Sequence, residues 1–253
     1  MTDAQEARLA MRRGDWTGPT GGRVHGFIQA NLVVLPRAEA YDFLVYCQRN
    51  PKACPVIDVT DPGDPEPRKS ASDADLRTDL PRYRIFRDGV HEQDVMEITH
   101  LWSSDSVAFL LGSSLSFDAA LARAGVEIFG DVWIFTTNIE TFPAGGFRGP
   151  LYVTMRLMSP ADSIIAIQLT SRFVYTHGAP IHIGQPGDIG ADISGPIYGE
   201  PLQQIPEGLI GVFWACGVTP QRAAQEARPP LMITHSPGHG FVTDLNMDQF
   251  CLP

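Results

Sequence analysis

The segment VFWACGVTPQRAAQEARPPLMITH, residues 212–235, decides the fold that this sequence predicts. It begins with a short apolar run, turns at Gly217, continues with a helical pattern and ends in a second apolar run. Strands that alternate with helices in this way are typical of an α/β protein with parallel strands and crossover helices. Upstream, SPADSIIAIQLT (159–170) predicts another helix, with Ser159 as its cap and Pro160 at its first position. We therefore expect a fold of the α/β class.

The middle of the chain has a different pattern. RYRIFRDGV (82–90) alternates and contains an Asp-Gly turn, which predicts a β-hairpin, and LYVTMRLM (151–158) is a further β-like run. These segments favour antiparallel pairing. We predict an α/β/α layered sandwich made of residues 1–80 and 160–253, with a second, smaller α+β domain inserted at 81–159.

Composition excludes several classes of partner. The chain is 43% hydrophobic and 19% charged, which is ordinary for a globular protein. Its net charge of −10 argues against a nucleic-acid partner, because phosphate binding requires a basic face. No run approaches the ~18 apolar residues of a membrane span, and the N-terminal segment lacks the apolar core of a signal peptide. We expect a cytoplasmic protein with neither nucleic acid nor membrane as a partner.

The basic residues favour an acidic ligand. Lys52 and Lys69 are the two lysines, and the other 17 basic residues are arginines. Neither lysine lies in the buried setting that Schiff-base or pyridoxal chemistry requires, and the sequence has no P-loop or GxGxxG motif. Arginine, in contrast, binds carboxylates through two parallel hydrogen bonds. The sequence predicts a small acidic substrate and no organic cofactor.

Three apolar runs between Thr170 and Asp244 end in loops of small residues with side chains that carry protons. These loops contain His177, His182, Cys216, His235, His239 and Asp244. The ligand crevice of a parallel sheet lies at the carboxyl ends of its strands, so the pattern predicts an enzyme active site. The four histidines and Cys216 can also form a zinc or manganese site. A divalent metal therefore remains an alternative to a site without metal.

Proton transfer is assigned to the histidine loops. His239 and His182 are expected to exchange protons, with Asp244 orienting an imidazole, because histidine titrates near neutral pH. The turn PGHGF (237–241) offers backbone N–H groups to a carboxylate or a developing oxyanion. The alternative for this segment is a tight turn before a strand, with no role in chemistry.

Substrate binding is assigned to polar residues at the ends of strands. GSSLSF (112–117) places three hydroxyls at a strand-to-helix turn, where Ser113, Ser114 and backbone amides can hold a carboxylate. Further candidates are Asn138, Arg148 and, as a weaker one, Arg172, with Arg156 nearby in the sequence. Each arginine can instead form a surface salt bridge. Cys216 is expected to line the pocket, either as a nucleophile or as a packed side chain.

Several long motifs resemble the D-glutamate cyclase family over nearly the whole chain. They include GFIQANLVVLP, VAFLLGSSLSF, TSRFVYTHGAPIHIG, FWACGVTPQ and ITHSPGHGFVTDL. The resemblance implies an α/β/α sandwich with a smaller α+β domain. It also implies a lyase that removes water from a small acidic metabolite, most directly by cyclising D-glutamate to 5-oxo-D-proline. The alternatives are a hydro-lyase acting on a hydroxy acid and a non-catalytic binder of acidic metabolites.

One position departs from the family pattern. Thr141 stands where members often have a cysteine, and a threonine is a poor nucleophile without an adjacent base. Activity is in doubt if that thiol is essential. A homodimer is compatible with the modest size and the proline-rich loops of the chain.

Overall fold

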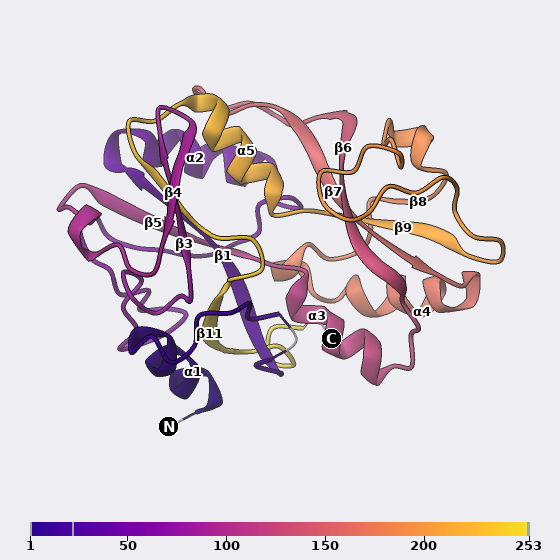
Figure 1. Cartoon of the computed structure of the whole chain (residues 1–253), viewed down its shortest axis with the longest axis horizontal. Helices are drawn as coiled ribbons and strands as arrows, with labels where there is room; N and C mark the ends of the chain where they lie inside the picture. Colours follow the sequence, from indigo (N-terminus) through magenta and orange to yellow (C-terminus); the bar gives the residue numbers. More distant parts are fainter. Residues whose placement is uncertain (1, 22, 252–253) are drawn as a thin grey trace.

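Two β-sheets lie side by side in the computed structural model, which describes residues 2–21 and 23–251 (Figure 1). The first sheet has the strand order β2-β5-β1-β10-β3-β4, and β11 also pairs with β1. Its strands are β1 (Phe27–Pro36), β2 (Val56–Val59), β3 (Tyr83–Arg87), β4 (Val90–Val95), β5 (Ser106–Gly112), β10 (Met232–His235) and β11 (Phe241–Asn246). The second sheet has the order β6-β7-β9-β8 and contains β6 (Phe129–Glu140), β7 (Pro150–Met158), β8 (His182–Gly184) and β9 (Ile210–Ala215).

The mixture of helices and sheets confirms the predicted α/β class, but the predicted parallel pairing is wrong. All the strand pairs with a registered ladder are antiparallel. The prediction depends on residues 212–235, whose two apolar runs are β9 and β10, and these strands lie in different sheets. The helix between them therefore connects two sheets instead of crossing over within one. Both runs are almost wholly buried, and a continuous apolar run is typical of parallel sheets but does not depend on the direction of the neighbouring strands.

The described residues form five α-helices and three short 3-10 helices besides the strands. The α-helices are α1 (Asp3–Arg12), α2 (Arg37–Arg49), α3 (Leu115–Arg123), α4 (Pro160–Thr170) and α5 (Val218–Ala227). The 3-10 helices are η1 (Thr99–Leu101), η2 (Val174–Thr176) and η3 (Pro186–Ile189). The predicted start of α4 is confirmed, because the Ser159 side chain accepts from the Asp162 N–H and Pro160 follows it.

The two faces of β1 pack against different layers. Leu32 and Val34 join one core cluster with Phe117 of α3, whereas Val33 and Leu35 join another with Phe43 of α2. The first cluster also contains Met158 and Trp214 of the second sheet, so the cores of the two sheets are continuous. Residues 62–75 form a loop that contributes buried side chains such as Ala71 and Ala74 to this cluster.

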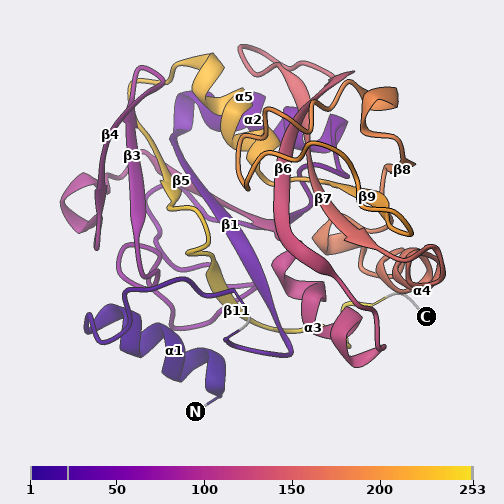
Figure 2. The ribbon, with the colours of Figure 1, turned by 45° about the vertical axis from the view of Figure 1, so that its right-hand side comes forward.

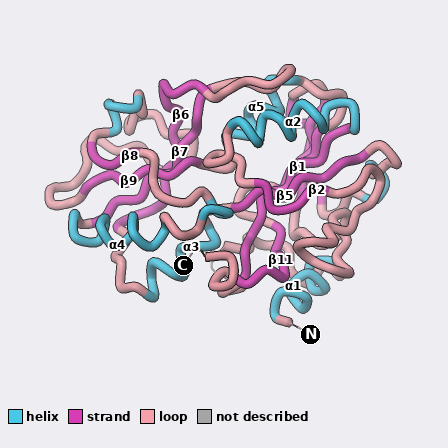
Figure 3. Tube along the Cα trace, turned by 180° about the vertical axis from the view of Figure 1, so that it is seen from behind, coloured by secondary structure: helices cyan, strands magenta, loops and turns pink. Residues whose placement is uncertain are grey.

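α3 and α5 both begin near the middle of the molecule, where the two sheets meet. From there they run toward opposite edges, and this arrangement is visible from the front, in the turned view and from behind (Figures 1, 2 and 3). Strands from 81–159 are shared between the sheets, since β3, β4 and β5 belong to the first and β6 and β7 to the second. The division into two domains stays a prediction.

Candidate active site

A cleft with a volume of about 480 Å³ lies between the two sheets, beside the starts of α3 and α5. Its walls come from both sheets and from both strand-to-helix junctions. The lining residues are Pro19, Asn31, Ser113, Ser114, Asp131, Val132, Ile134, Thr154, Arg156, His177, Tyr198, Cys216, Gly217, Val218, Gln221, His235, Pro237 and Gly238. A cleft of this size accommodates a small metabolite.

Arg156 of β7 is the basic centre of the cleft. Its side chain is only 1% exposed, and its Nη2 donates to Asp118 Oδ1 over 2.7 Å. The guanidinium carbon lies 5.2 Å from the ring centroid of Phe117 and 5.3 Å from that of Trp214. These two aromatic rings hold the guanidinium in place through cation–π contacts.

Part of the Arg156 guanidinium has no partner. Nε and Nη1, which together carry three of its five N–H groups, make no hydrogen bond to any residue that the structure describes. Leaving buried donors unpaired costs about 1–3 kcal/mol for each group, and more for a charged one. A carboxylate bound in the cleft satisfies these donors, because its oxygens match the geometry of the guanidinium.

Two helix N-termini add to the positive potential of the cleft. α3 begins after Ser114 and α5 begins after Gly217, and no side chain caps either helix. The N–H groups of Ser116, Phe117 and Thr219 in these first turns already donate to backbone carbonyls. The positive end of each helix dipole nevertheless favours anions. Arg156 offers one place for a negatively charged group, and the two helix starts offer a second.

His177 lines the cleft as a neutral base. Its Nδ1 lies 2.9 Å from the carbonyl oxygen of Lys52, so Nδ1 carries the proton and Nε2 is left as an acceptor. Burial lowers the pKa of His177 to about 4, and the nearby Arg156 adds to this effect. The residue also has a left-handed backbone with φ of 82°. Strained backbone of this kind in a non-glycine residue is concentrated at functional sites.

Gly112 allows His177 to lie beside the serine loop. A Cβ atom added at Gly112 would lie 1.7 Å from the carbonyl oxygen of Tyr175. Only glycine therefore permits η2 to approach the end of β5 so closely. This contact brings His177 and Ser113 to the same cleft.

His235, at the end of β10, is the second histidine of the cleft and has the opposite tautomer. Its Nδ1 accepts from the Leu32 N–H over 3.2 Å, so the proton of the neutral ring is on Nε2. Burial lowers the pKa of His235 to about 4. At neutral pH the cleft thus contains one imidazole that accepts through Nε2 and one that donates through Nε2.

Cys216 lies at the start of α5, as expected for a pocket residue. Burial raises the pKa of its thiol, although hydrogen bonds from Thr154 and from the Val218 N–H and the charge of Arg156 act in the opposite direction. The thiol is therefore protonated at neutral pH, which favours the packed alternative over a nucleophile.

The structure brings three of the predicted site residues to the cleft, namely Ser113, Ser114 and Cys216. The other six are not among its lining residues. Asn138, Arg148 and Arg172 are exposed. His182 Nε2 lies 2.9 Å from the Gln185 carbonyl, and His239 Nδ1 lies 2.7 Å from the Pro237 carbonyl.

The expected partner of Asp244 requires correction. Its carboxylate accepts two hydrogen bonds of 3.0 Å from Arg8 of α1, rather than orienting an imidazole. Arg8 is buried and also donates to the Val242 carbonyl, so the pair holds α1 against β11. His239 remains near the cleft, since the two preceding residues, Pro237 and Gly238, line it.

Sequence reasoning assigned no role to Asn31 and Gln221 of the cleft. It named Arg156 only as an arginine near the binding candidates, and His235 only among the loop residues and possible metal ligands. Arg156 had a recognisable signal, because it is a lone charge within the apolar run LYVTMRLM. A charged residue in a buried strand requires a partner or a ligand. Asn31 and Gln221 carry no such signal, since single amides occur throughout the chain.

Thr141 has a structural role. Its hydroxyl donates to the Gly149 carbonyl and accepts from Tyr46 over 3.1 Å. It is not a lining residue of the cleft. The replacement of the usual cysteine therefore leaves the composition of the cleft unchanged.

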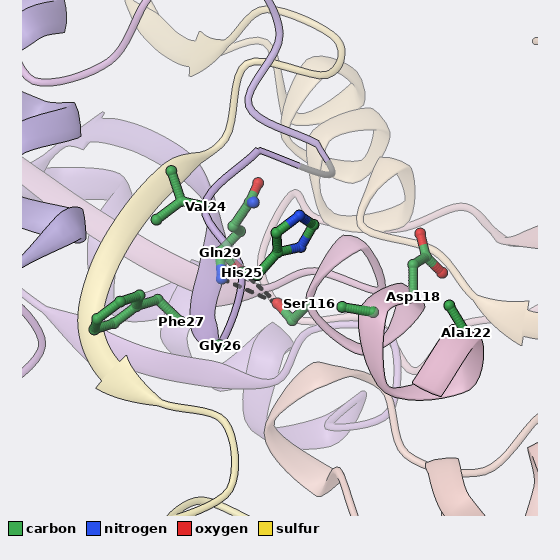
Figure 4. Close-up of a pocket in the computed structure, with 9 residues that line it drawn as sticks. Val24, His25, Gly26, Phe27, Gln29, Ser116, Asp118 and Ala122 are labelled. Atoms are coloured by element: carbon green, nitrogen blue, oxygen red, sulfur yellow. Dashed lines mark hydrogen bonds between the residues drawn. The ribbon is translucent and has the colours of Figure 1, made fainter. Parts of the chain in front are cut away.

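A smaller cavity of about 240 Å³ lies beside α3 (Figure 4). Its Ser116 donates to the Gln29 carbonyl and accepts from the Gln29 N–H, so these groups satisfy one another. Ser116 therefore ties α3 to β1. Asp118 reaches from this cavity to Arg156 in the cleft.

Among the residues that the structure describes, no three His, Cys, Asp or Glu side chains are grouped as metal ligands would be. The same residues contain no helix with the length and apolarity needed to cross a bilayer. The expectation that no cofactor is required stays a prediction.

Comparison with known proteins identifies relatives over nearly the full length. A protein named "Putative hydro-lyase" from Stutzerimonas stutzeri is 53% identical, with 96% of this chain and 93% of that protein aligned. Similarly named proteins from Bacillus licheniformis and Geobacillus kaustophilus are 48% and 50% identical, each over 97% of this chain and 95% of its own length. A solved nitrogen repressor-like protein from Methanococcus jannaschii aligns over 91% of each chain at 12% identity, and its TM-score of 0.38 is too low to carry an argument.

The relatives' names are of the lyase type, and the family model for D-glutamate cyclase matches residues 107–244. That range contains Arg156, both histidines of the cleft and the starts of α3 and α5. The match covers more than half of the chain. The chain belongs to the D-glutamate cyclase family.

Proposed function

We propose that this protein cyclises D-glutamate to 5-oxo-D-proline and water in the cleft around Arg156. The observation that carries the proposal is the buried guanidinium with unpaired Nε and Nη1 atoms. A carboxylate is the group that such donors bind best. Glutamate has two carboxylates, and the helix starts at Ser114 and Gly217 offer a place for the second.

The two neutral histidines supply the proton transfers. His177 Nε2 accepts a proton from the substrate ammonium, and the amine nitrogen then attacks the carbon of the γ-carboxylate. His235 Nε2–H donates a hydrogen bond to the oxygen on which charge develops. The protonated His177 returns its proton to the leaving oxygen. The second nitrogen proton joins this oxygen as the C–O bond breaks, so that one C–N bond forms and one water departs.

Holding the substrate amine close to its own γ-carboxylate contributes much of the rate acceleration. Attack within one molecule requires glutamate to fold so that its amine meets its own γ-carboxylate, and a binding site that holds both carboxylates imposes that conformer. The cleft volume of about 480 Å³ suits a substrate of this size.

Dehydration of a hydroxy acid is the second candidate, and the names of the bacterial relatives favour it. The same carboxylate site, base and donor serve such a reaction, in which a proton leaves carbon and a hydroxyl leaves as water. The product distinguishes the two, because a conjugated double bond absorbs ultraviolet light and a saturated lactam does not.

The test is incubation of the purified protein with D- and L-glutamate and a panel of hydroxy acids. Loss of water is followed by mass spectrometry and the product by ultraviolet absorbance. The proposal predicts a lactam from D-glutamate. Saturable binding of D-glutamate with no product over hours would identify a non-catalytic binder instead.

The histidine assignment has its own test. His177→Gln removes the base, and we expect turnover of D-glutamate to fall by about 10²–10⁴-fold. His182→Gln and His239→Gln are the matched variants, because both residues lie outside the lining of the cleft. If either of these abolishes turnover while His177→Gln does not, the proton carrier is the residue predicted from the sequence.

A further inference from the structure

Two hydrogen-bond donors meet on one ring nitrogen of His235. The Leu32 N–H donates to Nδ1 over 3.2 Å, and the side-chain Nε2 of Gln221 lies 3.2 Å from the same atom. A backbone N–H can only donate, so Nδ1 must provide the lone pair. The orientation of the Gln221 amide follows from this, because its carbonyl oxygen in that place would repel the lone pair.

The fold fixes both donors in place. Leu32 lies at the centre of β1 and is fully buried. Gln221 lies in the first turns of α5, which packs against β10, and both Gln221 and His235 line the cleft. The contact therefore connects the start of α5 to the end of β10 at the edge of the substrate site.

The charges around the ring act in the same direction. The groups that influence its protonation are Arg84 of β3 and His239 of the following turn, and both are basic. Burial is the larger effect, and together they hold the pKa of His235 near 4, well below its ordinary value. A neutral imidazole with its proton on Nε2 follows from these contacts.

We propose that Gln221 is a positioning residue that holds His235 in the tautomer with Nε2–H directed to the oxygen on which charge develops. This inference rests on the proposed cyclisation of D-glutamate, because the donor is useful only where such an oxygen forms. A neutral imidazole can polarise a carboxyl group by hydrogen bonding without first taking up a proton. His235 then donates this hydrogen bond equally well at every pH in the neutral range.

Gln221→Glu tests the assignment with almost no change in shape. A carboxylate at this position favours a proton on Nδ1 in competition with the hydrogen bond from the Leu32 N–H, so the pKa of His235 rises. Gln225→Glu is the matched control, because it adds the same charge one turn later on α5 without contacting His235.

The first readout is nuclear magnetic resonance of the imidazole, which requires no substrate and no activity. In the native protein, the His235 signals, identified by their loss in His235→Gln, should show the Nε2–H tautomer and not titrate between about pH 5 and pH 8. In Gln221→Glu they should titrate within this range, and in Gln225→Glu they should not. An Nδ1–H tautomer in the native protein, or equal behaviour of the two Glu variants, would overturn the inference.

The second readout is the pH profile of D-glutamate turnover. We expect kcat/KM of Gln221→Glu to fall about tenfold for each pH unit below the raised pKa, whereas the native protein and Gln225→Glu stay level. If the resonance results hold and no variant turns over D-glutamate, the tautomer assignment stands and the proposed function fails. The two conclusions are therefore separable.

Discussion

Arg156 shows how a single residue can favour function over stability. Its guanidinium is buried, has one carboxylate partner and leaves Nε and Nη1 without partners among the described residues. A buried charge of this kind is seldom the most stable choice, since an apolar side chain of similar volume often does as well or better. The residue therefore indicates a ligand more strongly than any other feature of the cleft.

We predict that Arg156→Met lowers turnover of D-glutamate by about 10²-fold or more and leaves the free energy of unfolding unchanged or higher. Asp118 tolerates the change because 34% of its side chain is exposed. Kinetics and urea unfolding measure the two effects. Arg148→Met, which removes an exposed arginine outside the cleft, should leave both unchanged. A normal rate in Arg156→Met would remove the carboxylate site from the mechanism.

At the scale of elements, the start of α5 depends on a close contact with β1. A Cβ atom added at Gly217 would lie 2.1 Å from Nδ2 of Asn31, which donates to the Gly112 carbonyl. Gly217 has φ of −62°, so the requirement for glycine here is steric and not conformational. The contact joins β1, the end of β5 and the start of α5 around one side of the cleft.

Gly217→Ala should therefore displace the start of α5 and reduce both stability and activity. We expect the free energy of unfolding to fall by about 1–3 kcal/mol, as in other overpacked sites, with a lower kcat/KM for D-glutamate. Gly187→Ala is the control, because a Cβ atom there meets no atom within 4 Å. Equal stabilities for the two variants would show that Asn31 moves aside freely.

Local elements were largely predictable from the sequence, whereas their pairing was not. The Asp88-Gly89 hairpin turn and the Ser159 cap are both found where expected, because each depends on neighbouring residues. The start of α5 is not marked by a local cap, since α5 begins after Gly217 and the Thr219 hydroxyl accepts from the Tyr152 N–H. Direction and order of strands depend on contacts between distant segments, which no local pattern contains.

The site was predicted in part for the same reason. Ser113, Ser114 and Cys216 lie at strand-to-helix junctions, and such junctions are visible in the sequence. The choice among the histidines could not be predicted from the sequence. His177 and His235 differ from the other two in their burial and in their hydrogen bonds to the backbone of Lys52 and Leu32. Those bonds span more than 100 residues of sequence.

At the scale of the whole molecule, the Arg8–Asp244 pair joins α1 to the edge strand β11. We expect Asp244→Asn to lower the free energy of unfolding by roughly 1–3 kcal/mol and to leave kcat unchanged. The loss is smaller than for a fully buried pair because 25% of the Asp244 side chain is exposed. Urea unfolding and turnover are measured on one preparation. A loss of turnover at normal stability would restore the catalytic role first predicted for Asp244.

Stability should also depend on pH through the two buried histidines. The unfolded chain takes up their protons near pH 6.5, whereas the pKa values of His177 and His235 in the folded protein are about 4. Protonation thus favours the unfolded chain. Stability is full above about pH 6.5 and falls as the pH decreases toward 4, by roughly 3 kcal/mol for each residue.

Chemical unfolding at a series of pH values measures this decline. The double variant His177→Gln, His235→Gln should flatten the curve between about pH 4 and pH 6.5. His100→Gln, which replaces a histidine that is 60% exposed, should leave the slope as it is. An unchanged slope in the double variant would show that other groups cause the decline.

The position of β10 between β1 and β3 has a consequence for biosynthesis. While the ribosome is still translating the middle of the message, β1, β2 and β5 can already pair, but the β3–β4 hairpin has no neighbour in the sheet until β10 emerges. The gap closes only when Met232–His235 has left the exit tunnel, and the same strand brings His235. A nascent chain halted before that point has unpaired edges on β1 and β3, and such exposed strand edges are bound by chaperones.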